Sequence, residues 1–258
     1  MKVTLTRHEG QARSTAEDVV AIEEPLEIRI GDKPLSVTMR TPGDDFALAA
    51  GFLVSESVIT GPEAIESIRH WGSPNVVRVS LSDGVRVDFQ RLQRHFYSTA
   101  SCGVCGKTSI DALRMQAKPL ESTLQITAAT LSALSPIVQQ HQETFAATGG
   151  LHAAALFAPD GRLISIREDV GRHNAVDKVI GGEFLERRWP LADRILFVSG
   201  RTSFEIVQKA VMARVAIIAA ISAPSSLAVD LAREMNITLA GFVRGERFNV
   251  YSGPERIT

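Results

Sequence analysis

The sequence predicts an α/β (α+β) protein, with a C-terminal mixed, mostly parallel sheet that carries helices on both faces and a smaller β-rich N-terminal domain. From residue 122 onward, short apolar strands alternate with helical patterns, which is typical of a parallel sheet covered by helices. Between residues 19 and 90 the pattern is mainly strand-like. We therefore expect a β-rich α+β domain over 1–95, a connector over 96–121 and an α/β domain over 122–258.

The N-terminal block is expected to contain strands over 27–30, 35–39, 76–81 and 85–89. The last two runs are separated by Ser82, Asp83 and Gly84, and Asp-Gly is a strong signal for a hairpin turn. One helix is expected near 44–56, because apolar residues recur there at helical spacing.

The C-terminal block begins with an expected helix near 128–142, followed by a hairpin of strands 151–157 and 163–167 that turns at Asp160 and Gly161. Helices are then expected over 174–186, 204–213 and 224–235, and strands over 195–198, 215–221 and 238–243. Asp177 and Lys178 are expected to pair with each other on the surface of the first of these helices.

Composition limits the partners of the chain. Hydrophobic residues make up 45% and charged residues 22%, as in ordinary globular proteins, and 28 Lys plus Arg against 29 Asp plus Glu give a net charge of -1. A balanced chain has no overall attraction for nucleic acid or anionic membranes. No apolar run reaches the roughly 20 residues that cross a bilayer, and the N-terminus lacks a signal-peptide core. A cytoplasmic protein is expected.

Loops rich in glycine, hydroxyls and arginine follow four strands, at 168–173, 199–203, 222–226 and 244–247. The carboxyl ends of parallel strands share one edge, so these loops should converge there. Three of them open helices, whose N-termini favour anions. The forked donors of Arg172, Arg201, Arg244 and Arg247 suit phosphate. The sequence therefore predicts a nucleotide-like phosphorylated ligand, although each loop taken singly could be a plain helix N-cap.

Two histidines lie near these loops. His173 lies within an arginine-bearing loop and is the better candidate for a ligand contact. His152 begins a strand, where a lone histidine more often has a structural role than a functional one. No GxGxxG or GxxxxGK[ST] motif occurs, which argues against a dinucleotide fold and an NTPase P-loop.

The chain contains two cysteines, Cys102 and Cys105, each followed by glycine. An expected helix start after Gly106 and the cation of Lys107 would lower a thiol pKa, and the thiolate is the nucleophile. Zinc would need about four ligands, and the histidines are isolated. Reactive sulfur is therefore favoured over a half zinc site or buried packing, and no metal site is predicted.

The runs CGVCG (102–106), TGGLH (148–152), EDVGRHNAVDK (168–178), SGRTS (199–203) and GFVRG (241–245) together resemble the formate dehydrogenase accessory sulfurtransferase (FdhD) family. The motifs are long, occur in the family's order and extend from Cys102 to the C-terminus; the N-terminal block resembles the family more loosely. A cytidine deaminase-like C-terminal fold is implied by this resemblance.

The resemblance also implies a sulfur relay. A cysteine desulfurase would pass sulfur to Cys102 as a persulfide, with Cys105 assisting or acting as an alternate carrier. The sulfur would then reach molybdenum or tungsten in a bound bis(molybdopterin guanine dinucleotide) substrate, destined for the catalytic subunit of formate dehydrogenase. The resemblance further implies that the protein forms a homodimer and that it holds no tightly bound metal of its own. The cofactor-binding residues would be Phe242, Val243, Arg244, Gly245, Glu246 and Arg247, with Arg172, His173, Ser199, Gly200, Arg201 and Ser225 as further candidates.

Three other functions remain open on the sequence. A zinc nucleobase deaminase would need His-x-Glu, but His152 is followed by Ala153 and Ala154. A non-catalytic chaperone would bind the cofactor without carrying sulfur. A thioredoxin-like exchanger would place CxxC near a βαβ pattern, which this chain does not do.

Overall fold

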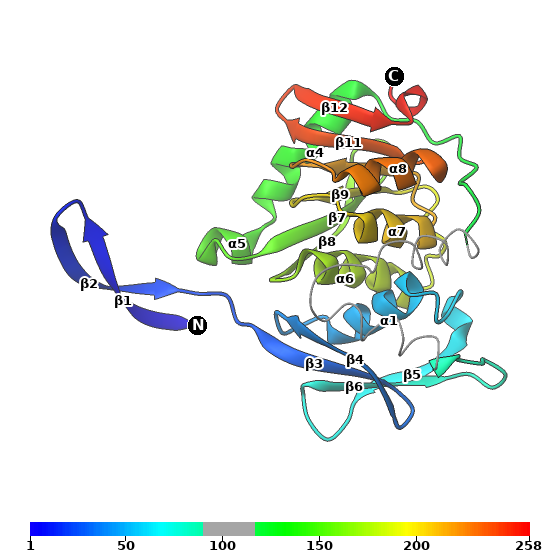
Figure 1. The fold of residues 1–258 in the computed structure, drawn as a ribbon, viewed down its shortest axis with the longest axis horizontal. Coiled ribbons are helices and arrows are strands. Elements are labelled where there is room, and N and C mark those ends of the chain that lie inside the picture. The colour runs from blue at the N-terminus through cyan, green and yellow to red at the C-terminus, as the bar shows by residue number, and fades with distance from the viewer. Residues whose placement is uncertain (90–116) are drawn as a thin grey trace.

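The computed structural model describes residues 1–89 and 117–258 (Figure 1). A six-stranded sheet has the order β12-β11-β10-β9-β7-β8, and a four-stranded sheet has the order β4-β3-β6-β5. A separate hairpin, β1 (Lys2–Glu9) and β2 (Ala12–Val19), extends away from the body of the molecule.

The larger sheet consists of β7 (His152–Phe157), β8 (Leu163–Asp169), β9 (Ile195–Val198), β10 (Ile217–Ala220), β11 (Thr238–Arg244) and β12 (Arg247–Ser252). Strands β9, β10 and β11 are parallel. Strand β7 is antiparallel to both β8 and β9, so β8 runs in the same direction as β9. Strands β8, β9, β10 and β11 therefore share one direction, and the sheet is mixed, as predicted. Three of its five neighbouring pairs are nevertheless antiparallel.

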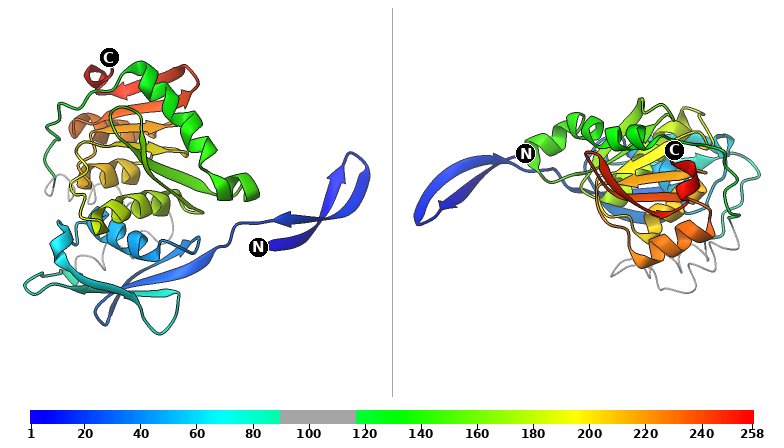
Figure 2. Two further views of the ribbon diagram at one scale, coloured as in Figure 1. Left: turned by 180° about the vertical axis from the view of Figure 1, so that it is seen from behind. Right: turned by 90° about the horizontal axis from the view of Figure 1, so that it is seen from above.

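Helices cover both faces of this sheet, as predicted (Figure 2). Helices α6 (Arg172–Leu185), α7 (Phe204–Met212) and α8 (Ser226–Glu234) pack on one face around buried residues such as Val179, Val207 and Leu231. Helix α4 (Ala128–Gln140) covers the other face through Leu131 and Leu134, and the short α5 (Glu143–Thr148) follows it. A short 3-10 turn, η2 (Pro254–Arg256), lies at the end of the chain.

The N-terminal sheet consists of β3 (Glu24–Ile30), β4 (Lys33–Arg40), β5 (Ile65–His70) and β6 (Val76–Leu81), with the 3-10 turn η1 (Pro62–Ala64) before β5. One face packs on α1 (Asp45–Ser55), the helix expected near 44–56. Helix α1 in turn packs directly on α6 (Figure 1). The two helices approach closely because Gly51 and Gly181 have no side chains: a Cβ on Gly181 would lie 1.9 Å from the carbonyl oxygen of Ala47.

The predicted hairpin of strands 76–81 and 85–89 is wrong. Residues 85–88 form no strand, and β6 instead pairs with β5 on one side and with β3, in parallel, on the other. Strand β5 was not predicted, and it takes the neighbouring position that the sequence assigned to 85–89. The division at 95 and 121 stays a prediction, because most of the connector lies outside the described residues. None of the described helices is both long and apolar enough to cross a membrane.

Candidate functional site

The predicted loops meet at the carboxyl edge of the large sheet. Gly200, in the second loop, lies against the first: a Cβ there would be 3.7 Å from Cδ of Arg172, and 3.3 Å from Nδ1 of His152. Thr202 joins the next loop, because its N–H donates to the carbonyl of Ala223 and its own carbonyl accepts from Ser225. The N–H of Phe242 donates to the carbonyl of Ser222. We call this region the edge site: Arg172, His173 and residues 199–203, 222–225 and 242–247.

Helix capping accounts for only one of the loop hydroxyls. Ser225 is the N-cap of α8, and its hydroxyl accepts from the N–H of Ala228 at 3.3 Å. Ser199 faces the sheet, where its hydroxyl accepts from the N–H of Ala153 at 2.8 Å. Ser203 begins α7 without capping it and instead lies 3.1 Å from Nε2 of His173. The plain N-cap explanation therefore holds for Ser225 and not for Ser203.

Polar atoms without partners remain at this edge. Thr202 is only 1% exposed, and its hydroxyl has no hydrogen-bond partner among the described residues. Nε of Arg172 is likewise buried without a partner in the described part of the chain. Buried polar groups are normally bonded, so unpaired ones at this edge indicate a missing ligand or ordered water.

The hairpin of β11 and β12 carries the predicted residues 242–247. Phe242 has a left-handed φ of 55°, which is uncommon for an aromatic residue, and the residue is 42% exposed. Arg244 and Arg247 face each other across the turn at Gly245 and Glu246. Like charges in opposite positions repel, so a bound anion would stabilise this turn. The Val243 side chain is fully buried in the core, which leaves only its backbone for a ligand.

Both histidines are held in the neutral form. Burial lowers the pKa of His152, and the charges of Arg172 and Arg201 lower it further. Burial and the nearby Lys209 and Arg172 lower the pKa of His173 to about 4. The edge site therefore combines fixed arginine charges with the uncharged imidazole of His173, and the uncharged His152 lies beside it.

Asp177 and Lys178 do not pair with each other, contrary to the prediction. Both are buried, and they point to different partners: Asp177 to Lys209 at 2.8 Å and Lys178 to Asp169 at 2.8 Å. Neighbouring residues on a helix point in different directions, so two consecutive charges rarely meet. We call these four residues the interdomain charge cluster, because Ser55 donates to Asp177 at 2.8 Å and Lys178 donates to the carbonyl of Thr41 at 2.8 Å.

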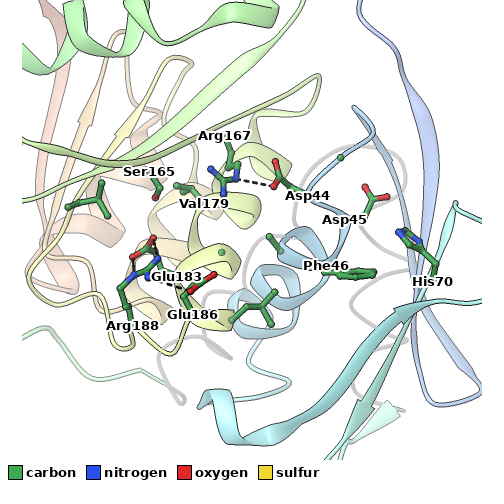
Figure 3. A pocket seen from close by; sticks show the side chains of 15 residues that line it. Asp44, Asp45, Phe46, His70, Ser165, Arg167, Val179, Glu183, Glu186 and Arg188 are labelled. Atoms are coloured by element: carbon green, nitrogen blue, oxygen red, sulfur yellow. Dashed lines mark hydrogen bonds and ion pairs between the residues drawn. The ribbon is translucent and has the colours of Figure 1, made fainter.

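A cavity of about 600 Å³ lies elsewhere, between α1, α6 and β8 (Figure 3). Figure 3 shows Arg167 beside Asp44 and Arg188 between Glu183 and Glu186. These arginines are already matched by carboxylates, and no residue of the predicted site lines this cavity. Among the described residues the arginines of the edge site form no salt bridge, so this site is the better candidate for an anionic ligand.

The predicted sulfur carriers, Cys102 and Cys105, lie outside the described residues. Within the described ranges, no group of three or more His, Cys, Asp or Glu side chains is arranged to hold a metal ion. The roles of both cysteines stay predictions.

Comparison with known proteins identifies the family. The model of the FdhD/NarQ family matches residues 21–258. A protein named sulfur carrier protein FdhD from Streptomyces coelicolor is 51% identical, over 95% of this chain and 91% of its own length. A protein of the same name from Mycobacterium tuberculosis is 47% identical, over 95% and 93%.

A solved structure agrees with this match. It is described as a formate dehydrogenase accessory protein from Desulfotalea psychrophila, is 27% identical, and superposes with a TM-score of 0.81 over 100% of this chain and 99% of its own. Sequence and fold thus agree over nearly the whole chain, which belongs to the FdhD/NarQ family.

Proposed function

We propose that this protein is a sulfurtransferase that carries sulfur as a cysteine persulfide to the cofactor of a formate dehydrogenase. The names of its relatives, sulfur carrier protein and formate dehydrogenase accessory protein, support this function. A cysteine desulfurase would supply the sulfur. The acceptor would be the molybdenum or tungsten of a bis(molybdopterin guanine dinucleotide) cofactor, before its insertion into the catalytic subunit. We also propose a homodimer, which sedimentation analysis would test.

The chemistry needs one thiolate and two sulfur–sulfur bond cleavages. The Cys102 thiolate attacks the terminal sulfur of the desulfurase persulfide, and the desulfurase cysteine leaves as a thiolate. In the second step the terminal sulfur bonds to the metal, an electron pair of the reduced metal converts it to sulfide, and Cys102 leaves as a thiolate. Cys105 would assist or serve as an alternate carrier.

The composition of the edge site supports the proposal that the protein binds this cofactor. Arg172, Arg201, Arg244 and Arg247 would bind the diphosphate groups of the cofactor. The exposed ring of Phe242 offers a surface on which a guanine or pterin ring could stack. Thr202 would gain the hydrogen-bond partner that its buried hydroxyl lacks within the described chain.

Mass spectrometry tests the sulfur step. After incubation with a cysteine desulfurase and cysteine, the peptide that contains Cys102 should gain one sulfur atom. Cys102→Ala should abolish activation of the client dehydrogenase and leave GDP binding intact, while Cys105→Ala serves as the matched variant. Full activation by a protein lacking both thiols would favour the chaperone function instead.

A further inference from the structure

The contacts of His173 fix its tautomer. Nε2 of His173 lies 3.1 Å from Oγ of Ser203 and 3.8 Å from Oε2 of Glu205, so both oxygens face the same ring nitrogen. A hydroxyl has one proton, and an ionised carboxylate can only accept. The negative charge of Glu205 beside Nε2 favours the proton on this nitrogen, and Ser203 then accepts from Nε2–H of His173.

The charge state of Glu205 is consistent with this arrangement. Burial alone would raise the pKa of Glu205, but hydrogen bonds from Ser203 and from its own backbone N–H, with the charges of neighbouring groups, lower it. Glu205 is thus an acceptor, and its carboxylate lies 3.8 Å from Nε2 of His173, on the same side of the ring as Ser203. The arrangement is not a catalytic triad, because no carboxylate is bonded to Nδ1 in the described chain.

The other nitrogen of His173 is available to a ligand. With Nε2 protonated and the ring neutral, Nδ1 carries a lone pair and can only accept. Among the described residues Nδ1 has no hydrogen-bond partner, and it is not one of the buried unpaired atoms, so it is not fully buried. The charged groups that face the ring are Arg172 from α6 and Lys209 and Glu205 from α7, with the neutral His152 from β7.

A neutral acceptor among arginines selects a particular kind of ligand atom. A phosphate oxygen is also an acceptor and would be repelled by the Nδ1 lone pair, so His173 is unsuited to bind phosphate. An N–H donor of a ring would satisfy it, while the arginines bind the phosphates of the same ligand. Thr202, whose buried hydroxyl has no partner in the described ranges, is separate evidence that a ligand belongs at this edge.

We propose that His173 determines specificity by accepting, through Nδ1, a hydrogen bond from the 2-amino group of a 2-amino-4-oxopyrimidine edge. Guanine and the pterin both carry this edge, so the inference rests on the proposed cofactor and identifies what the site reads in it. Ser203 and Glu205 are positioning residues, because they act through the tautomer of His173.

Titration calorimetry on the full chain tests the proposal with GDP, with IDP (which lacks the 2-amino group) and with 6-hydroxymethylpterin. The wild type should prefer GDP over IDP about tenfold, the effect of one hydrogen bond. His173→Leu, which has no acceptor, should lose this preference. His173→Asn, whose Oδ1 lies near the position of Nδ1, should keep most of it.

The results distinguish whether His173 binds the guanine or the pterin of the cofactor. If the pterin is the group that His173 reads, His173→Leu should weaken pterin binding about tenfold and leave the ratio of GDP to IDP affinity unchanged. If GDP and pterin bind to the wild type and His173→Leu alters neither the ratio nor pterin binding, the role of His173 is refuted and the proposed function survives. If neither probe binds to the wild type, the proposed cofactor site is itself wrong.

Nitrogen NMR tests the tautomer directly. In protein labelled with ¹⁵N-histidine, with the His173 signals assigned through His173→Asn, the ring should be the Nε2–H form at pH 7. Ser203→Ala should produce a mixture of the two tautomers. A wild-type ring protonated on Nδ1 would overturn the proposal.

Discussion

The interdomain charge cluster and the edge site both contain buried polar groups, but only the cluster satisfies its own. Asp177 is bonded to Lys209 and Ser55, and Asp169 accepts from Lys178 and from the N–H of Thr41. At the edge site, in the described chain, the hydroxyl of Thr202 and Nε of Arg172 have no partner. Paired polar groups hold the two sheets together, whereas unpaired ones mark the place where a ligand would complete the structure.

This difference makes the cluster sensitive to loss of one partner. Lys209→Met should lower the free energy of unfolding by about 3–5 kcal/mol, because Asp177 would stay buried without its cation. Urea unfolding measures the change. Lys118→Met, at an exposed lysine, should change stability by less than about 0.5 kcal/mol. A loss for Lys209→Met as small as that of the control would mean that the pair does not hold the domains together.

Close packing beside the cluster gives the next largest effect. In Gly181→Ala the new Cβ would meet backbone atoms, 1.9 Å from the carbonyl of Ala47 and 2.5 Å from the nitrogen of Gly51, so α1 and α6 must separate. We expect a loss of about 1–3 kcal/mol or more. Gly182→Ala is the matched control, because its Cβ would meet only Nη2 of Arg167, at 3.8 Å. The control should stabilise α6 by about 0.5–1 kcal/mol; equal losses in thermal unfolding would refute the packing argument.

The same comparison shows what sequence could predict. The convergence of the loops at one edge followed from strand direction, and the contacts of Gly200, Thr202 and Phe242 confirm it. Residue patterns did not reveal that Asp177 and Lys178 are buried. Lys209, the partner of Asp177, is 32 residues away, and contacts to the two side chains come from distant residues, Ser55 of α1 and Thr41. The contacts of Ser203 also depend on tertiary structure, since a serine at a helix start is ordinarily a cap.

The strands that the sequence analysis missed in the N-terminal half, β1, β2 and β5, have weak patterns of apolar residues. Strands β1 and β2 bury almost nothing, so no alternation of apolar residues marks them. Asp83 and Gly84 gave a strong turn signal, but a turn signal does not determine whether the chain that follows pairs with the chain before. In strand β5 only Ile65 and Ile68 are half-buried, so its apolar pattern was too weak to predict a strand there in place of the one expected over 85–89.

Removing the unpaired hydroxyl of the edge site should affect binding more than stability. Thr202→Val should change the free energy of unfolding by less than about 0.5 kcal/mol, and it should weaken GDP binding fivefold to tenfold, or about 1 kcal/mol, if the ligand supplies the missing partner. Thr238 is equally buried, but its hydroxyl donates to the carbonyl of Gly253 at 2.7 Å. Thr238→Val should therefore cost about 1 kcal/mol of stability. Unchanged GDP affinity in Thr202→Val would exclude this hydroxyl from the site.

The smallest expected effect is the dependence of stability on pH that His173 contributes. Its folded pKa is about 4 and its ordinary value is 6.5, so between these values the unfolded chain binds one more proton than the folded protein. The contribution to stability is therefore complete above pH 6.5 and is lost as the pH falls towards 4.

One proton corresponds to about 1.4 kcal/mol per pH unit. The side chain is 36% exposed, so screening by solvent should reduce the loss between pH 7 and pH 5 to about 1 kcal/mol. His173→Asn should remove this part of the slope in urea unfolding at the two pH values, while His8→Asn, in the exposed N-terminal hairpin, should keep it. A variant with the same slope as the wild type would mean that His173 binds a proton equally well in the folded and the unfolded protein, so the site would not hold its ring in the neutral form.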